Sequence, residues 1–179
     1  MQRILSVLLA ILLPSLAWAG NYRDITLPGG NMRFQGLIIA ESCRVETGGL
    51  QMTVNMGRVS SNRFQSVGQD INPIPFDINL QDCSSYVGRN VGIVFHGVAH
   101  SRNPEVLSIG MEKDAAVGVG IALFDKENSL VPLNGNPQFS GTLKDGVFTF
   151  HFVAKYRAVE YPVSGGVVNA QAWFTLIYQ

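Results

Sequence analysis

The sequence predicts an all-β protein made of two packed sheets. In several separate stretches, apolar residues recur at every second position, and clusters of Gly, Pro, Asn, Asp and Ser separate these stretches. No stretch after residue 19 keeps a helical period. Many short strands with frequent turns and a single pair of cysteines, Cys43 and Cys83, favour a two-sheet sandwich of the immunoglobulin type.

The first 19 residues have the pattern of a secretory signal peptide. Arg3 precedes an apolar run over residues 4–13, and the small-residue pattern Ala-Trp-Ala occupies residues 17–19. We expect cleavage between Ala19 and Gly20. The apolar run is shorter than the about 20 residues that span a bilayer, so an uncleaved anchor helix is the less favoured alternative.

Length and charge limit what the exported chain can be. Removing 19 of the 179 residues leaves 160, the size of one ordinary domain. Arg3 is the one charged residue removed, so 12 Lys and Arg face 13 Asp and Glu, a net charge of −1. We therefore expect no nucleic-acid partner and no direct membrane insertion.

The two cysteines of an exported chain predict one disulfide, Cys43 to Cys83. Closing a loop of this length stabilises a fold by about 4 kcal/mol in the chain-entropy model. A metal site needs more ligands. His96 and His100 are four residues apart, but positions four apart do not converge in a strand, and His151 falls in a different strand. We expect no metal and no cofactor.

The predicted strands can be placed one by one. They span residues 32–39, 51–56, 74–80, 91–98, 118–124, 147–156 and 167–178. Pro75 indicates an edge or a strand start. The three phenylalanines of 147–156, Phe148, Phe150 and Phe152, share one face and predict core packing, with a ligand platform as the alternative. Residues 101–116 are expected to form a loop or an edge.

The sequence contains no local signature of catalysis. Gly118 and Gly120 lack the third glycine, the helix and the lysine of a phosphate-binding loop, and no hydrolase or metalloprotease motif is present. Asp125 and Glu127 flank a lysine in a predicted turn and are expected to be solvated. We predict that the protein is not an enzyme; a site assembled from distant loops is the open alternative.

The C-terminal segment keeps a period of two for thirteen residues, whereas ordinary strands have about 5–6 residues. Its alternate residues are Gly166, Val168, Ala170, Ala172, Phe174, Leu176 and Tyr178. A long apolar strand edge is an aggregation hazard unless another chain pairs with it. The pattern therefore predicts a partner strand here, and a central strand already covered on both sides is the alternative.

The N-terminal segment could supply such a strand. Residues 20–30 are polar and contain Pro-Gly-Gly, so we expect an exposed tail. In an extended chain, Met32, Phe34 and Gly36 point to one side, and a segment of this kind could pair with a neighbour's sheet edge. Alternatively, it is the domain's own first strand.

A set of spaced residues runs through the chain after residue 19: Phe34-Gln35-Gly36 with Cys43 seven residues after the glycine, Cys83, Gly-Val-Gly-Ile over 118–121, Gly166 fourteen residues from the end, and the penultimate Tyr178. In these residues the chain resembles the subunits of chaperone–usher fimbriae, most closely the minor, fimbrin-like subunits of type 1 fimbriae.

The resemblance implies an incomplete immunoglobulin-like sandwich that a donated strand completes. A periplasmic fimbrial chaperone would supply the strand first, with its basic residues holding the terminal carboxylate. At the outer-membrane usher, the N-terminal extension of another fimbrial subunit would replace it. The accepting strand would be 166–179, and the donor would centre on Met32, Phe34 and Gly36. The implied domains are a signal peptide (1–19), an N-terminal extension (20–35) and a pilin domain (36–179).

The main functional hypothesis is a structural subunit of a surface fimbrium that supports cell adhesion as a rod, adaptor or terminating and anchoring subunit. The alternative is a single-domain adhesin that binds a host glycan directly. That alternative needs exposed aromatic residues, and Trp173, the only tryptophan after residue 19, lies in the terminal strand.

Overall fold

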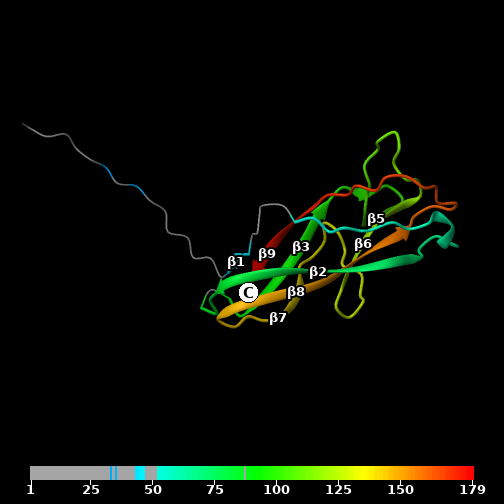
Figure 1. The fold of residues 1–179 in the computed structure, drawn as a ribbon. Coiled ribbons are helices and arrows are strands. Elements are labelled where there is room, and N and C mark those ends of the chain that lie inside the picture. The colour runs from blue at the N-terminus through cyan, green and yellow to red at the C-terminus, as the bar shows by residue number, and fades with distance from the viewer. Residues whose placement is uncertain (1–32, 34, 36–42, 47–51, 87) are drawn as a thin grey trace, which may run out of the picture. The chain divides into compact units, whose positions relative to one another are not determined.

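Two antiparallel β-sheets form the fold in this computed structural model, which describes residues 33, 35, 43–46, 52–86 and 88–179 (Figure 1). The larger sheet has the order β1-β2-β8-β6-β5-β4 and the smaller one β7-β3-β9. The strands are β1 (Arg44–Val45), β2 (Asp70–Cys83), β3 (Asn90–Gly97), β4 (Ala99–His100), β5 (Asn103–Leu107), β6 (Val119–Asp125), β7 (Gln138–Thr142), β8 (Gly146–Ala158) and β9 (Ala172–Tyr178), with one 3-10 turn at Ser61–Arg63. The all-β prediction is confirmed.

The long pair β2 and β8 supplies one wall of the core. Their register places Phe76 opposite Phe152 and Ile78 opposite Phe150, so these side chains share the inner face. Phe150 is 1% exposed and stacks on Phe152. Phe148 is partly buried against the same core. The prediction that the three phenylalanines pack in the core is confirmed.

β3 supplies the facing wall. Its alternate residues Val91, Ile93 and Phe95 are buried in the same core. The Phe95 ring meets Phe152 of the other sheet edge to face, with ring centres 4.9 Å apart. The core therefore lies between the two sheets, as in a sandwich.

Several strand boundaries differ from the sequence prediction. β2 extends beyond 74–80 at both ends, past irregularities where Asn72 and Asp82 adopt positive φ angles. Asn and Asp tolerate positive φ angles. In the sequence they are typical of turns, so they indicated strand ends at positions where β2 continues. Pro75 pairs with Val153 of β8. Among the described residues, β1 pairs with β2 at Leu80 and Gln81, so no described strand flanks Pro75 on its other side, as an edge position requires.

Two further strands depart from expectation. Residues 101–116 contain β5, which pairs with β6 through Leu107 and Ile121, although Asn103-Pro104 had indicated a loop or an edge. β7 was not predicted because its sequence Gln-Phe-Ser-Gly-Thr has no apolar alternation. Residues 52–56 of the predicted strand 51–56 belong to no ladder of the described chain.

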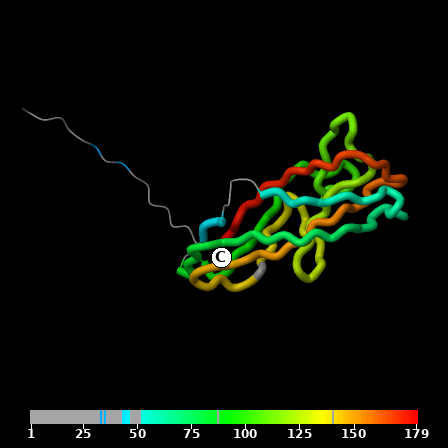
Figure 2. The backbone as a smooth tube through the Cα atoms, in the orientation of Figure 1, coloured from blue at the N-terminus to red at the C-terminus, as the bar shows by residue number. Residues whose placement is uncertain are grey.

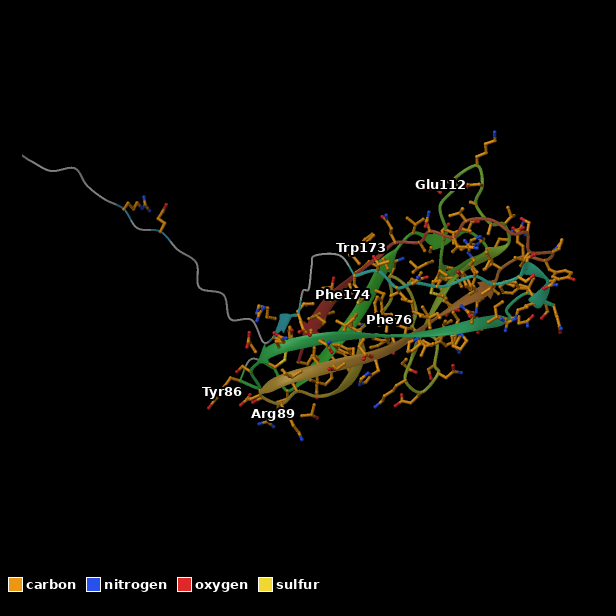
Figure 3. All side chains as sticks on the ribbon, viewed as in Figure 1. Phe76, Tyr86, Arg89, Glu112, Trp173 and Phe174 are labelled. Atoms are coloured by element: carbon orange, nitrogen blue, oxygen red, sulfur yellow. A yellow bond between two sulfur atoms is a disulfide. The ribbon has the colours of Figure 1, made fainter. Side chains whose placement is uncertain are left out.

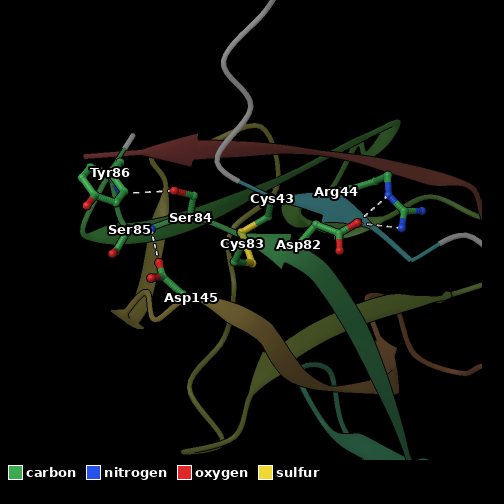
Figure 4. The surroundings of a disulfide bond; sticks show 8 residues. All are labelled: Cys43, Arg44, Asp82, Cys83, Ser84, Ser85, Tyr86 and Asp145. Atoms are coloured by element: carbon green, nitrogen blue, oxygen red, sulfur yellow. Dashed lines mark hydrogen bonds and ion pairs between the residues drawn. A yellow bond between two sulfur atoms is a disulfide. The ribbon is translucent and has the colours of Figure 1, made fainter.

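The predicted disulfide between Cys43 and Cys83 is confirmed and joins the chain before β1 to the end of β2 (Figure 4). Beside it, Arg44 Nη2 donates to Asp82 Oδ2 at 2.8 Å, an exposed ion pair. Asp145 Oδ1 accepts a hydrogen bond from the Ser85 amide at 2.7 Å, and this bond lowers the pKa of Asp145. The pairing thus holds the loop after Cys83 to the turn before β8.

None of the described helices is long and apolar enough to cross a membrane. Over the same residues, His, Cys, Asp and Glu side chains gather at no point in the threes that a metal ion needs. His96, His100 and His151 lie in β3, β4 and β8.

Candidate functional site

Along one side of the C-terminal segment, residues 167–179, lie first residues 110–117 and then β3. β9 pairs with β3, with Ala172 opposite Gly97 and Phe174 opposite Phe95. β3 ends at Gly97, and the chain over 110–117 takes its place upstream. There the Ala116 amide donates to the Val167 carbonyl at 2.9 Å, and the Gly110 amide donates to the Asn169 carbonyl at 2.8 Å. The predicted strand 167–178 is therefore a ladder of seven residues preceded by a separately bonded segment.

The direction of the peptide groups shows which edge is occupied. Gln179 and Asn90 exchange both backbone hydrogen bonds, at 3.0 and 2.8 Å. Successive residues of a strand direct their backbone N–H and C=O groups to opposite sides of the strand. The backbone groups of the odd-numbered residues from 167 to 179 therefore point toward β3 and residues 110–117. The backbone groups of the even-numbered residues point away from them. In the described chain, no backbone hydrogen bond reaches residues 168, 170, 172, 174 or 176 on that side. We call this side the open edge.

The inward side chains along the open edge are only partly covered. Of the seven predicted accepting residues, five are partly buried against the core: Val168, Ala170, Phe174, Leu176 and Tyr178. Across the ladder, their partners Val91 and Ile93 are 0% exposed. The core is thus closed on the β3 side and incomplete on the β9 side.

Gly166 and Ala172 differ from the other five, because both are exposed. A Cβ at Gly166 would collide with backbone atoms of Ala115, Ala116 and Asp114. Glycine is therefore required there by the close approach of residues 110–117. Ala172 lies in the ladder with an inward position but does not pack against the core cluster.

Residues 52–59 form a second incompletely covered segment. Val54, Met56 and Val59 are partly buried against the same core cluster. The Tyr156 hydroxyl donates to the Gly57 carbonyl at 3.3 Å, and burial raises the pKa of Tyr156. In the view of Figure 2, this segment (cyan) runs between the C-terminal segment (red) and β2 (green). The sequence predicts a strand over residues 51–56. Its pattern does not indicate that residues 52–56 pair with no strand of the described chain.

This arrangement suits strand addition rather than catalysis. An extended peptide at a free sheet edge gains main-chain hydrogen bonds, and its alternate side chains enter the spaces between the inward residues. Asp125, one of the two carboxylates considered for a catalytic role, has a structural role in a turn. Its Oδ1 accepts hydrogen bonds from the amides of Glu127 and Ser129.

The outward face of β9 carries Trp173, whose ring stacks on His96 of β3 with centres 5.9 Å apart and planes 20° apart. Figure 3 shows Trp173 beside Phe174 on this strand.

The predicted cleavage residues Ala19 and Gly20 and the donor residues Met32, Phe34 and Gly36 lie outside the described residues. Arg33 and Gln35 of the donor segment are described, and both are exposed.

Comparison with known proteins gives one consistent result. The family model described as fimbrial protein matches residues 32–179. The type-1 fimbrial protein C chain of Escherichia coli is 36% identical over 155 residues, 86% of each chain. A fimbrin-like protein of Salmonella typhi is 31% identical over 157 residues, 87% of this chain and 89% of its own. The crystal structure of the P pilus rod subunit PapA shares the fold, with a TM-score of 0.66 at 23% identity over 78% of this chain and 100% of that one.

These relatives are structural subunits of fimbriae, not enzymes, and they do not favour the single-domain adhesin. The open edge of β9 marks the fold as an immunoglobulin-like sandwich that is incomplete, as in the pilus subunits that it matches. The chain belongs to the fimbrial protein family and is an exported structural subunit of surface pili of the chaperone–usher type.

Proposed function

We propose that this subunit polymerises by strand donation, accepting a strand from another protein at the open edge of residues 168–176. The observation that carries the proposal is the coincidence of two features on one edge. Backbone groups without a partner in the described chain alternate there with apolar side chains that remain partly exposed. A donated strand satisfies both, because main-chain pairing and side-chain burial come from the same extended peptide.

The donating part is the N-terminal extension, residues 20–35, with Met32, Phe34 and Gly36 facing the neighbour's core. Arg33 and Gln35 are the described residues of this segment, and their side chains lie together. With the Gln35 amide oriented so that its oxygen faces Arg33, it accepts hydrogen bonds from Arg33 Nε and Nη2 at 3.2 and 3.1 Å. Side chains two residues apart meet in this way on one face of a strand, which leaves the residues between and beside them for the other face.

The partners follow from the order of assembly. A periplasmic fimbrial chaperone occupies the open edge first, the outer-membrane usher receives the complex, and the extension of the next subunit then replaces the chaperone. Within the fibre we propose a minor subunit that acts as an adaptor or as a terminating and anchoring subunit. Crosslinking in assembled fibres identifies the neighbours of this subunit. If the subunit crosslinks on both sides to further copies of itself, the minor role is contradicted.

The acceptance of a strand is tested with a synthetic peptide of residues 22–39 added to the oxidised mature chain. Because the peptide binds only the folded state, it should raise the melting temperature in proportion to the logarithm of its concentration. The matched control peptide carries Met32→Ser and Phe34→Ser and should stabilise far less. Equal melting temperatures with and without the unaltered peptide would contradict strand acceptance.

A further inference from the structure

Trp173 presents an uncovered aromatic surface toward the open edge. It is one of the outward, odd-numbered residues of β9, and the residue is 61% exposed. His96 stacks on the ring from β3, which lies on the occupied side of β9. The second face of the indole is therefore directed to the opposite side, where an added strand would lie.

Arg33 is suited to cover that surface. If the apolar residues of the donor segment face the neighbour's core, Arg33 faces outward, as Trp173 does. Its side chain is exposed and lies on the same face as Gln35. A guanidinium group stacks well on an indole ring, because it is planar, weakly hydrated and attracted by the ring quadrupole.

The inward residues favour the same register. In an antiparallel pairing with Arg33 opposite Trp173, Phe34 falls opposite Ala172 and Met32 falls opposite Phe174. Among the inward residues of β9, Ala172 is exposed, whereas the others are partly buried. The largest donor side chain would then occupy the space beside the smallest inward side chain of β9.

We propose that Arg33 of one subunit stacks on Trp173 of the next, so that the indole lies between the His96 ring and the guanidinium group and fixes the register of the donated strand. This proposal rests on strand donation and adds a specific outward contact to it. The two rings and the cation come from three strands: β3, β9 and the donated one.

A double-mutant cycle tests the contact. The mature chain and its Trp173→Leu variant are each titrated with the 22–39 peptide and with the same peptide carrying Arg33→Gln. The peptide concentration that produces the same fixed rise in melting temperature is measured for each combination. An exposed cation–π contact predicts that Arg33→Gln weakens binding to the unaltered chain about two- to fivefold. Binding to Trp173→Leu should change by less than this, because no indole remains.

A second readout and a matched control sharpen the test. Trp173 is the only tryptophan after residue 19, so its fluorescence reports this position alone. The unaltered peptide should change the emission more than the Arg33→Gln peptide at saturation. An Arg23→Gln peptide keeps the same net charge as Arg33→Gln and should bind like the unaltered one.

The outcomes separate the two proposals. Arg33→Gln and Arg23→Gln peptides that stabilise equally well overturn the stacking contact while strand donation stands. An equal loss from Arg33→Gln on both chains also overturns it. If neither peptide raises the melting temperature, strand donation itself is overturned, and the contact with it.

Discussion

Tyr156 links two parts of the chain that are 99 residues apart. Its hydroxyl donates to the Gly57 carbonyl, and burial raises its pKa. A folded-state pKa above the unfolded value of about 10 means that folding favours the neutral phenol. The stability this contributes is complete below pH about 10 and disappears as pH rises through the folded-state pKa.

We therefore expect Tyr156→Phe to act in two opposite ways. Near pH 7 the variant loses one hydrogen bond and about 0.5–1.5 kcal/mol of stability. As pH rises above about 10, it should lose less further stability than the unaltered chain, because it has no phenol to ionise. Urea unfolding at pH 7 and pH 11 measures both. If both proteins lose the same free energy of unfolding between pH 7 and pH 11, the role of the phenol is contradicted.

Single residues also show what sequence could and could not predict. The inward positions of Phe148, Phe150 and Phe152 follow from their spacing alone, because a strand alternates its faces. The hydrogen bond between Tyr156 and Gly57 depends on how two distant segments meet, and nothing local to either residue indicates it. The stacking of Trp173 on His96 depends in the same way on the register of β9 and β3.

At the scale of elements, the C-terminal strand was predicted in place but not in its pairing. Its apolar period extends unbroken from Gly166 to Tyr178, so sequence predicts one strand. The structure divides it, because β3 ends at Gly97 and residues 110–117 bind the upstream half. Residues 110–117 carry polar and charged residues and no strand pattern, so their docking could not be predicted.

Gly166→Val tests whether that docking holds the upstream half in place. The added side chain would collide with the backbone of Ala115 and Ala116, so residues 110–117 must move. We expect a loss of about 1–3 kcal/mol in urea unfolding and faster hydrogen exchange at the Ala116 amide. Gly165→Val is the matched control, because a Cβ at Gly165 meets nothing within 4 Å. Equal losses for the two variants would indicate a general backbone effect instead.

The described residues of the C-terminal unit form a sandwich whose edge at β9 is incomplete. Sequence predicted the fold class, because alternation and turns are local signals, and the resemblance implied that a strand is missing. Which backbone groups lack a described partner could not be predicted, since it depends on the side from which β3 and residues 110–117 approach β9. An incomplete core lowers stability, so the remaining constraints become more important.

The disulfide is the strongest of these constraints, and its loss should be compensated by a donated strand. Cys43→Ser combined with Cys83→Ser releases a loop of 40 residues and should cost about 4 kcal/mol. Alone, this variant should lack a cooperative thermal transition. With excess 22–39 peptide the transition should return, because binding to the folded state adds stability by mass action. Arg44→Gln, which removes the neighbouring exposed ion pair, is the control and should cost less than about 1 kcal/mol. A double-serine variant that melts like the unaltered chain without peptide would show that the incomplete sandwich is stable by its core alone.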